Sequence, residues 1–245
     1  MKKFGFTISE IIVSLTLIGV ISGIIMPGLV QNYKKEDYTK RLQIAISNFE
    51  RAMATLIMNE GVDDFTETKA WKSVKGSLDS NKTLTSNVKL FTGNISSVLP
   101  IIEFKKNVNY KNLTGDSEAD FHDAMAGVPV DFYTKNGVVY KIRLINDGKA
   151  PIRNEAYLIK SGISYSRRIG YVLVDVNGDS EPNRLGRDIF FYEFSADGRL
   201  YPYGGVEAIR YNGQNVVDLE NQCKTSKEGH YCAAYLAENR YEMDY

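Results

Sequence analysis

The fold is decided by a stretch at the start of the chain, MKKFGFTISE at residues 1–10 and IIVSLTLIGVISGIIMPGLV at residues 11–30. Between Phe6 and Val30 the only charged residue is Glu10. As a helix rising about 1.5 Å per residue, residues 6–30 span roughly 37 Å, which exceeds the thickness of about 30 Å of a hydrocarbon core. The stretch is therefore predicted to be a membrane-spanning helix. Because Lys2 and Lys3 precede it, we expect a cytoplasmic N-terminus and an exported remainder.

A cleaved secretory signal peptide is the alternative interpretation of a basic start followed by an apolar run. Such a leader carries a small-residue cleavage site after its apolar core and no acid at the beginning of that core. Here the run continues through MPGLVQNY at residues 26–33 without an Ala-x-Ala site, and Glu10 opens it. We therefore expect the span to be retained as an anchor.

Glu10 needs an explanation, because a carboxylate in a membrane helix costs on the order of 2.5–3.5 kcal/mol on insertion scales. The segment GFTISE at residues 5–10 resembles the prepilin processing motif of type IV pilins and type II secretion pseudopilins. The resemblance implies that a prepilin peptidase removes residues 1–5 by cutting after Gly5 and methylates the new N-terminus, Phe6. It also implies that Glu10 pairs with the N-terminal amine of a neighbouring subunit. A helix-capping glutamate in an ordinary membrane anchor is the alternative.

The resemblance extends to Gly19 and Pro27, which fall where many pilins carry helix-weakening residues. A proline inside a helix removes one hydrogen bond and bends the helix. The resemblance implies that the stretch between the two positions melts in the filament. Glycine and proline are also common in ordinary membrane helices.

After Val30 the spacing of apolar residues changes to intervals of four and three, at Tyr38, Leu42, Ala45, Phe49, Ala52 and Leu56. This spacing predicts an amphipathic helix over residues 31–61 that continues from the span and stops near Gly61. The stripe covers only about three heptads, so we expect it to pack on a sheet rather than in a coiled coil.

Residues 62–245 are predicted to form one globular head, because no internal repeat or low-complexity linker divides them. The weak pattern of residues 63–121 suggests a variable connector. Strand patterns follow at residues 138–144, 171–176, 189–194 and 199–201, with a hairpin turn at residues 195–198. The predicted fold is α+β: a long N-terminal helix, membrane-spanning in its first half, packed on an antiparallel sheet head, as in the lollipop plan of pilins.

Oxygen-bearing side chains alternate in one loop of the head, at Asp175, Asn177, Asp179 and Glu181. Such ligands suit a hard cation such as calcium, and some pseudopilins hold calcium in a loop between late strands. The EF-hand pattern itself fails, because Ser180 stands where that loop requires glycine. A turn in which Asn, Gly and Asp satisfy main-chain groups explains the same residues.

The two cysteines, Cys223 and Cys232, lie near the C-terminus. In an exported domain they are expected to form a disulfide, which for a loop of about ten residues contributes roughly 2.5–3 kcal/mol in the chain-entropy model. The loop resembles the disulfide-bounded C-terminal region of many pilins. A zinc site of Cys223, Cys232 and His230 is the alternative, although a fourth ligand is not evident.

Enzyme motifs are absent from the sequence, including Gly-x-Ser-x-Gly, the phosphate loop, the dinucleotide glycine fingerprint and His-Glu-x-x-His. Thirty basic residues balance thirty acidic ones, so no nucleic-acid partner is expected. The resemblance to prepilins implies a non-enzymatic subunit, a minor pilin or pseudopilin, of a type IV pilus or type II secretion-like filament. Its partners would be prepilin peptidase, other pilin or pseudopilin subunits and an inner-membrane assembly platform. The alternatives are a membrane-tethered binding or adhesion module and a DNA-uptake pilin.

Overall fold

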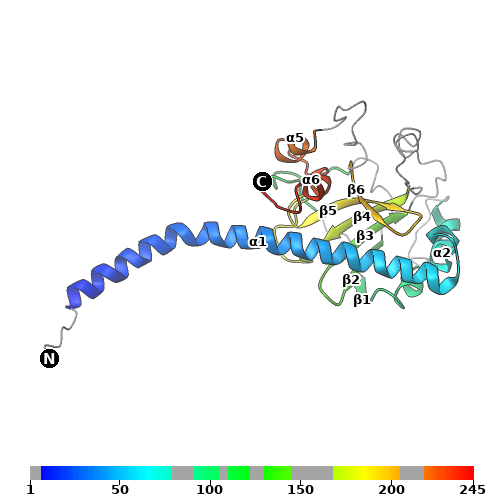
Figure 1. Cartoon of the computed structure of the whole chain (residues 1–245), viewed down its shortest axis with the longest axis horizontal. Helices are drawn as coiled ribbons and strands as arrows, with labels where there is room; N and C mark the ends of the chain where they lie inside the picture. Colours follow the sequence, from blue (N-terminus) through cyan, green and yellow to red (C-terminus); the bar gives the residue numbers. More distant parts are fainter. Residues whose placement is uncertain (1–6, 79–90, 105–109, 122–129, 145–167, 205–217) are drawn as a thin grey trace. The chain divides into compact units, whose positions relative to one another are not determined.

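The computed structural model describes residues 7–78, 91–104, 110–121, 130–144, 168–204 and 218–245 (Figure 1). The chain divides into two compact units, Met1–Asp37 and Tyr38–Tyr245. Helix α1, Ile8–Glu60, runs through both. The amphipathic part of α1 from Tyr38 onward therefore belongs to the same unit as the head.

The first unit is the apolar beginning of α1. Every side chain of residues 8–30 is exposed. Among the described helices, α1 alone is long and apolar enough to cross a membrane. Its most apolar stretch of 18 residues has a mean hydropathy of 2.2, and none of that stretch is buried. By length and composition, α1 is a candidate membrane span.

In the second unit, α1 lies across one face of the sheet (Figure 1). The predicted stripe is buried there, at Leu42, Ala45, Phe49, Ala52 and Leu56. The ring of Phe49 lies 5.3 Å from that of Tyr140 and 5.4 Å from that of Phe194, measured between centroids. The hydroxyl of Tyr140 donates a hydrogen bond of 2.8 Å to the main-chain oxygen of Ala45. The prediction that this stripe packs on a sheet is confirmed.

The end of α1 also matches the prediction. Gly61 has a φ of 62°, a left-handed conformation that disfavours residues with a Cβ. Its N–H donates to the oxygen of Met58 (3.1 Å), and the N–H of Val62 donates to that of Ile57 (3.3 Å). This is the Schellman pairing, which satisfies two of the last carbonyl groups of the helix.

The described strands form one six-stranded antiparallel sheet in which each strand neighbours the next in sequence. They are β1 (Ile101–Phe104), β2 (Val130–Thr134), β3 (Val139–Leu144), β4 (Arg168–Asp175), β5 (Ile189–Ser195) and β6 (Leu200–Pro202). Strands β3 to β6 correspond to the four predicted strands, and the predicted turn at residues 195–198 joins β5 to β6. The α+β class with a long N-terminal helix and an antiparallel sheet is thereby confirmed.

The segment 63–121 is more than a connector. It contains the short helix η1 (Phe65–Glu67), helix α2 (Lys69–Leu78) and strand β1. Strand β2 was also not predicted, because Asp131 interrupts its apolar character. The carboxylate of Asp131 lies 3.7 Å from the ammonium of Lys141 on the neighbouring strand, and this opposite charge offsets part of the cost of its burial.

Both faces of the sheet are covered, which explains why β4 and β5 are buried almost throughout. Opposite α1, Leu173 and Phe191 pack with Tyr110 and Leu185. Two short helices complete the head, α5 (Leu219–Lys224) and α6 (Cys232–Glu238), and α6 contacts β5 and β6.

Candidate functional site

The predicted processing site begins outside the described residues, since Gly5 and Phe6 precede them. Glu10 lies in the first turn of α1, and Thr7 directly precedes the helix. The N–H and the hydroxyl of Thr7 each donate to Oε2 of Glu10 at 2.8 Å, and the N–H of Glu10 donates to Oγ1 of Thr7 at 3.3 Å. This reciprocal arrangement is a capping box. Within a single chain, the Glu10 carboxylate is held by the start of its own helix.

The hydroxyl groups of Ser14 and Thr16, which follow in the apolar segment, are also satisfied locally. Ser14 donates to the main-chain oxygen of Glu10 at 2.7 Å, and Thr16 donates to that of Ile12 at 2.8 Å. A hydroxyl left without a partner in hydrocarbon would be costly, since no water is available to it. These polar side chains are therefore compatible with a lipid environment.

Helix α1 passes through Gly19 and Pro27 without a break. Pro27 lacks the N–H that would bond to the oxygen of Gly23, so the helix has one hydrogen bond fewer at this turn. A Cβ added to Gly19 or Gly23 would meet nothing within 4 Å. The stretch that the pilin resemblance implies to be melted is helical here. Melting in an assembled filament stays a prediction.

Two of the four residues predicted as calcium ligands, Asp175 and Asp179, use a side-chain oxygen in hydrogen bonds within the head. Oδ1 of Asp175 accepts the N–H groups of Asn177 (3.2 Å) and Gly178 (2.8 Å). Oδ1 of Asp179 accepts the hydroxyl of Tyr133 at 2.7 Å. Glu181 is exposed. In the part of the chain that the structure describes, no group of three or more His, Cys, Asp or Glu side chains is placed to hold a metal ion.

The alternative interpretation, a turn that satisfies main-chain groups, accounts for the loop. Gly178 has a φ of 65°, and an added Cβ would lie 3.0 Å from the oxygen of Gly137. At the far end of the loop, the carboxylate of Asp188 accepts the N–H groups of Asn183 (2.8 Å) and Arg184 (2.7 Å). Burial nevertheless raises the pKa of Asp188 above its ordinary value. The acidic residues thus organise the backbone of the loop.

Replacing Asp175 by alanine is expected to lower the free energy of unfolding by about 1–3 kcal/mol, because two N–H groups lose their acceptor. The loss should be the same in excess calcium and in excess chelator, measured by denaturant unfolding. Asp179→Ala is the matched control, with an expected loss below about 1 kcal/mol, because its partner is a side-chain hydroxyl that can turn to water. A loss at Asp175 that depends on calcium would favour the metal interpretation.

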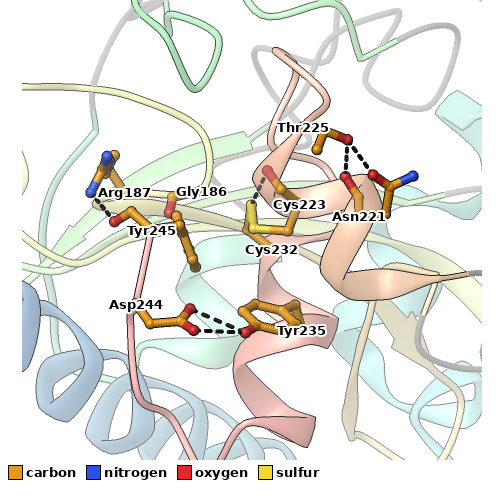
Figure 2. Close-up of a disulfide and its surroundings, with 9 residues drawn as sticks. All are labelled: Gly186, Arg187, Asn221, Cys223, Thr225, Cys232, Tyr235, Asp244 and Tyr245. Atoms are coloured by element: carbon orange, nitrogen blue, oxygen red, sulfur yellow. Dashed lines mark hydrogen bonds between the residues drawn. A yellow bond between two sulfur atoms is a disulfide. The ribbon is translucent and has the colours of Figure 1, made fainter.

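Cys223 and Cys232 form a disulfide, with an Sγ–Sγ distance of 2.06 Å, that links α5 to the first residue of α6 (Figure 2). Both cysteine residues are completely buried. Around the disulfide pack Leu113, Leu219, Ala234 and Tyr235. The expected pairing is present, and the zinc alternative loses two of its three ligands because both thiols are used in the bond.

The disulfide packs against the loop between β4 and β5 and against the end of the chain. Gly186 has a φ of 83°, and a Cβ there would lie 2.9 Å from Sγ of Cys232. The hydroxyl of Tyr245 donates to the main-chain oxygen of Gly186 at 2.9 Å, and the guanidinium of Arg187 donates to the main-chain oxygen of Tyr245 at 2.6 Å (Figure 2). The loop, the disulfide and the last residues therefore form one packed cluster.

A charged group borders this cluster. The ammonium of Lys224 lies 2.7 Å from Asp244 and 2.9 Å from Glu220, and the hydroxyl of Tyr235 donates to Asp244 at 3.1 Å. The hydrogen bond from Lys224 holds the pKa of Asp244 below its ordinary value, and Asp244 raises the pKa of Lys224. The carboxylate-bearing side chains of Glu220 and Asp244 are 64% and 46% exposed, so solvent screening keeps the contribution of these ion pairs to stability small.

The head contains a pocket of about 340 Å³ that was not predicted from the sequence. Its walls come from the second half of α1, from residues 98–100 and from the turn between β2 and β3. No motif marks it, because these three segments are far apart in the sequence and meet only in the folded chain.

No family model, no curated protein and no solved structure matches this chain. The assignment of a function therefore depends on the residues and geometry described above.

Proposed function

We propose that this chain is a non-enzymatic structural subunit, of the minor pilin or pseudopilin kind, of a type IV pilus or type II secretion-like filament. The observation that carries the proposal is Glu10, the single charge of residues 6–30. It is the fifth residue counted from Phe6, and Gly5 precedes Phe6, as the prepilin motif requires. An acid is costly at this position of a membrane helix unless it serves assembly or caps the helix.

The exposed apolar half of α1 supports the proposal. Large apolar side chains from Ile8 to Val30 are between 46% and 78% exposed in the single chain. A continuous apolar surface of this kind requires cover by lipid or by other subunits. In a filament subunit, lipid would cover this apolar surface in the membrane, and other subunits would cover it in the filament core.

The second half of α1 supports it as well. From Tyr38 onward the same helix is part of the head. Phe49 packs in the core between this helix and the sheet, and the main-chain oxygen of Ala45 accepts a hydrogen bond from Tyr140. The disulfide in the head suits an oxidising compartment outside the cytoplasm.

The proposal implies a location and a set of partners. The chain would be a single-pass protein of the inner membrane with an extracytoplasmic head before it enters the filament. It would meet prepilin peptidase first, then the assembly platform and other pilin or pseudopilin subunits. The zero formal net charge gives no support to a DNA-uptake subunit.

A membrane-tethered binding module is the second candidate, and the capping box favours it. Thr7 already satisfies the Glu10 carboxylate within one chain. A plain anchor needs nothing more of this glutamate than its role at the helix start.

The mature N-terminus tests the proposal. In cells with prepilin peptidase, mass spectrometry is expected to find a chain that begins at N-methylated Phe6, and in cells without the peptidase a chain that begins at Met1. Gly5→Val should block the cut, because the branched side chain of valine fills the space that glycine, without a Cβ, leaves for close approach of the backbone to the protease. Gly19→Ala, the matched control within the span, should be processed normally.

Two results would contradict this pathway. Intact Met1 in both kinds of cell would leave a plain anchor, and cleavage beyond Val30 would identify a secretory leader. Either result returns the head to the class of exported binding modules.

A further inference from the structure

The pocket beside α1 has an unusual balance of charge. Arg51 of α1 and Lys135 of the turn between β2 and β3 both line it, and none of its lining residues is acidic. The chain as a whole has equal numbers of basic and acidic residues. The excess of positive charge is therefore a property of this pocket and not of the composition.

No acidic group in the described part of the chain neutralises either cation. Residues 47, 48, 54 and 55, which lie one turn from Arg51 on α1, are Ser, Asn, Ala and Thr. Within the described residues, Arg51 and Lys135 form no ion pair. Both side chains are exposed, so a ligand entering the pocket can reach them.

Amide and apolar groups complete the pocket. Asn48 and Asn136 also line the pocket, and the side-chain amide of each carries an N–H₂ donor. Ala52 and Leu99, 4% and 3% exposed, supply an apolar surface. Donors next to an apolar surface favour a ligand that has both an anionic group and an apolar part.

We propose that this pocket binds an acidic peptide segment of a partner protein. An Asp or Glu carboxylate lies between Arg51 and Lys135, and a neighbouring apolar side chain of the peptide packs against Ala52 and Leu99. Guanidinium binds carboxylate through charge-assisted, paired hydrogen bonds. The volume of about 340 Å³ is at the lower end of the range for ligand pockets and is larger than an inorganic anion requires. The inference does not depend on the filament proposal, because a tethered binding module could use the same pocket.

The test uses the full chain in detergent micelles and a fluorescein-labelled peptide of alternating Glu and Leu, followed by fluorescence anisotropy. We expect saturable binding of this peptide and at least about tenfold weaker binding of a peptide with Gln in place of Glu, since one lost charged contact is worth roughly 1.5–3 kcal/mol. The double variant Arg51→Gln with Lys135→Gln should bind the Glu peptide about tenfold more weakly, or weaker still.

The matched control is Lys72→Gln with Lys227→Gln, which removes the same charge from two exposed positions outside the pocket. It is expected to change binding by less than about twofold, because exposed charges at a distance are screened. Equal weakening by both double variants would mean non-specific attraction. Absence of saturable binding, equal binding of the Gln peptide, or displacement by an equal concentration of inorganic phosphate would also overturn the proposal. Circular dichroism checks that all variants are folded.

Discussion

Replacing Phe49 by alanine is expected to lower the free energy of unfolding of the head by about 3–5 kcal/mol. Phe49 is completely buried, and its ring lies between those of Tyr140 and Phe194 at the place where α1 meets the sheet. Removal of the ring leaves a cavity between a helix and a sheet, and neither can collapse into it without loss of other contacts. The higher helix propensity of alanine offsets only about 0.5 kcal/mol.

The single tryptophan provides the measurement. Trp71 is 6% exposed and belongs to the same core as Phe49, so denaturant unfolding can be followed by its fluorescence. Ile44→Ala is the control on the same helix, where the side chain is 57% exposed, and its expected effect is within about 0.5 kcal/mol. Similar losses at both positions would mean that packing on the sheet does not decide the stability of this part of α1.

The features predicted from sequence are those that depend on local periodicity. The four and three spacing from Tyr38 to Leu56 shows which face of α1 is buried, whatever the partner is. Gly61 could be predicted as the helix end, because its left-handed conformation favours glycine. Strands β3 to β6 were recognisable from β-branched and aromatic runs.

Elements that depend on distant partners could not be predicted in the same way. Strand β1 has four residues, and its pairing with β2 brings together segments about 30 residues apart. Asp131 is understandable inside β2 only once Lys141 is known to lie beside it. For α6 a signal was present, since residues 232–238 contain three alanines, a leucine and a glutamate, all strong helix formers.

The same division holds for the candidate sites. Glu10 could be recognised from the sequence, because a single charged residue in an apolar segment stands out without knowledge of its structural partners. The composition of the Asp175 loop could not show whether its oxygens face a cation or the N–H groups of the loop itself, and the structure shows the latter for Asp175. The pocket has no sequence signal, because Arg51 and Lys135 meet only through the fold.

Replacing Glu10 by alanine is expected to lower incorporation of the chain into filaments more than tenfold while leaving it in the membrane. In the proposed filament, loss of the carboxylate leaves the amine of a neighbouring Phe6 unpaired in an apolar core, at a cost on the order of 2.5–3.5 kcal/mol. Incorporation is measured by cross-linking of sheared filaments, and membrane retention by fractionation of the same cells. Mass spectrometry of the N-terminus establishes that the variant is still processed.

Thr7→Val supplies the control that separates assembly from capping. It keeps the shape of Thr7 but removes the hydroxyl that both donates to and accepts from Glu10. Its expected cost is about 0.5–2 kcal/mol at the helix start, with filament incorporation close to that of the unaltered chain. If Glu10 serves only as a cap, the two variants will behave alike, because each breaks the same capping box. A large loss with Glu10→Ala and none with Thr7→Val requires a second partner for the carboxylate outside its own chain.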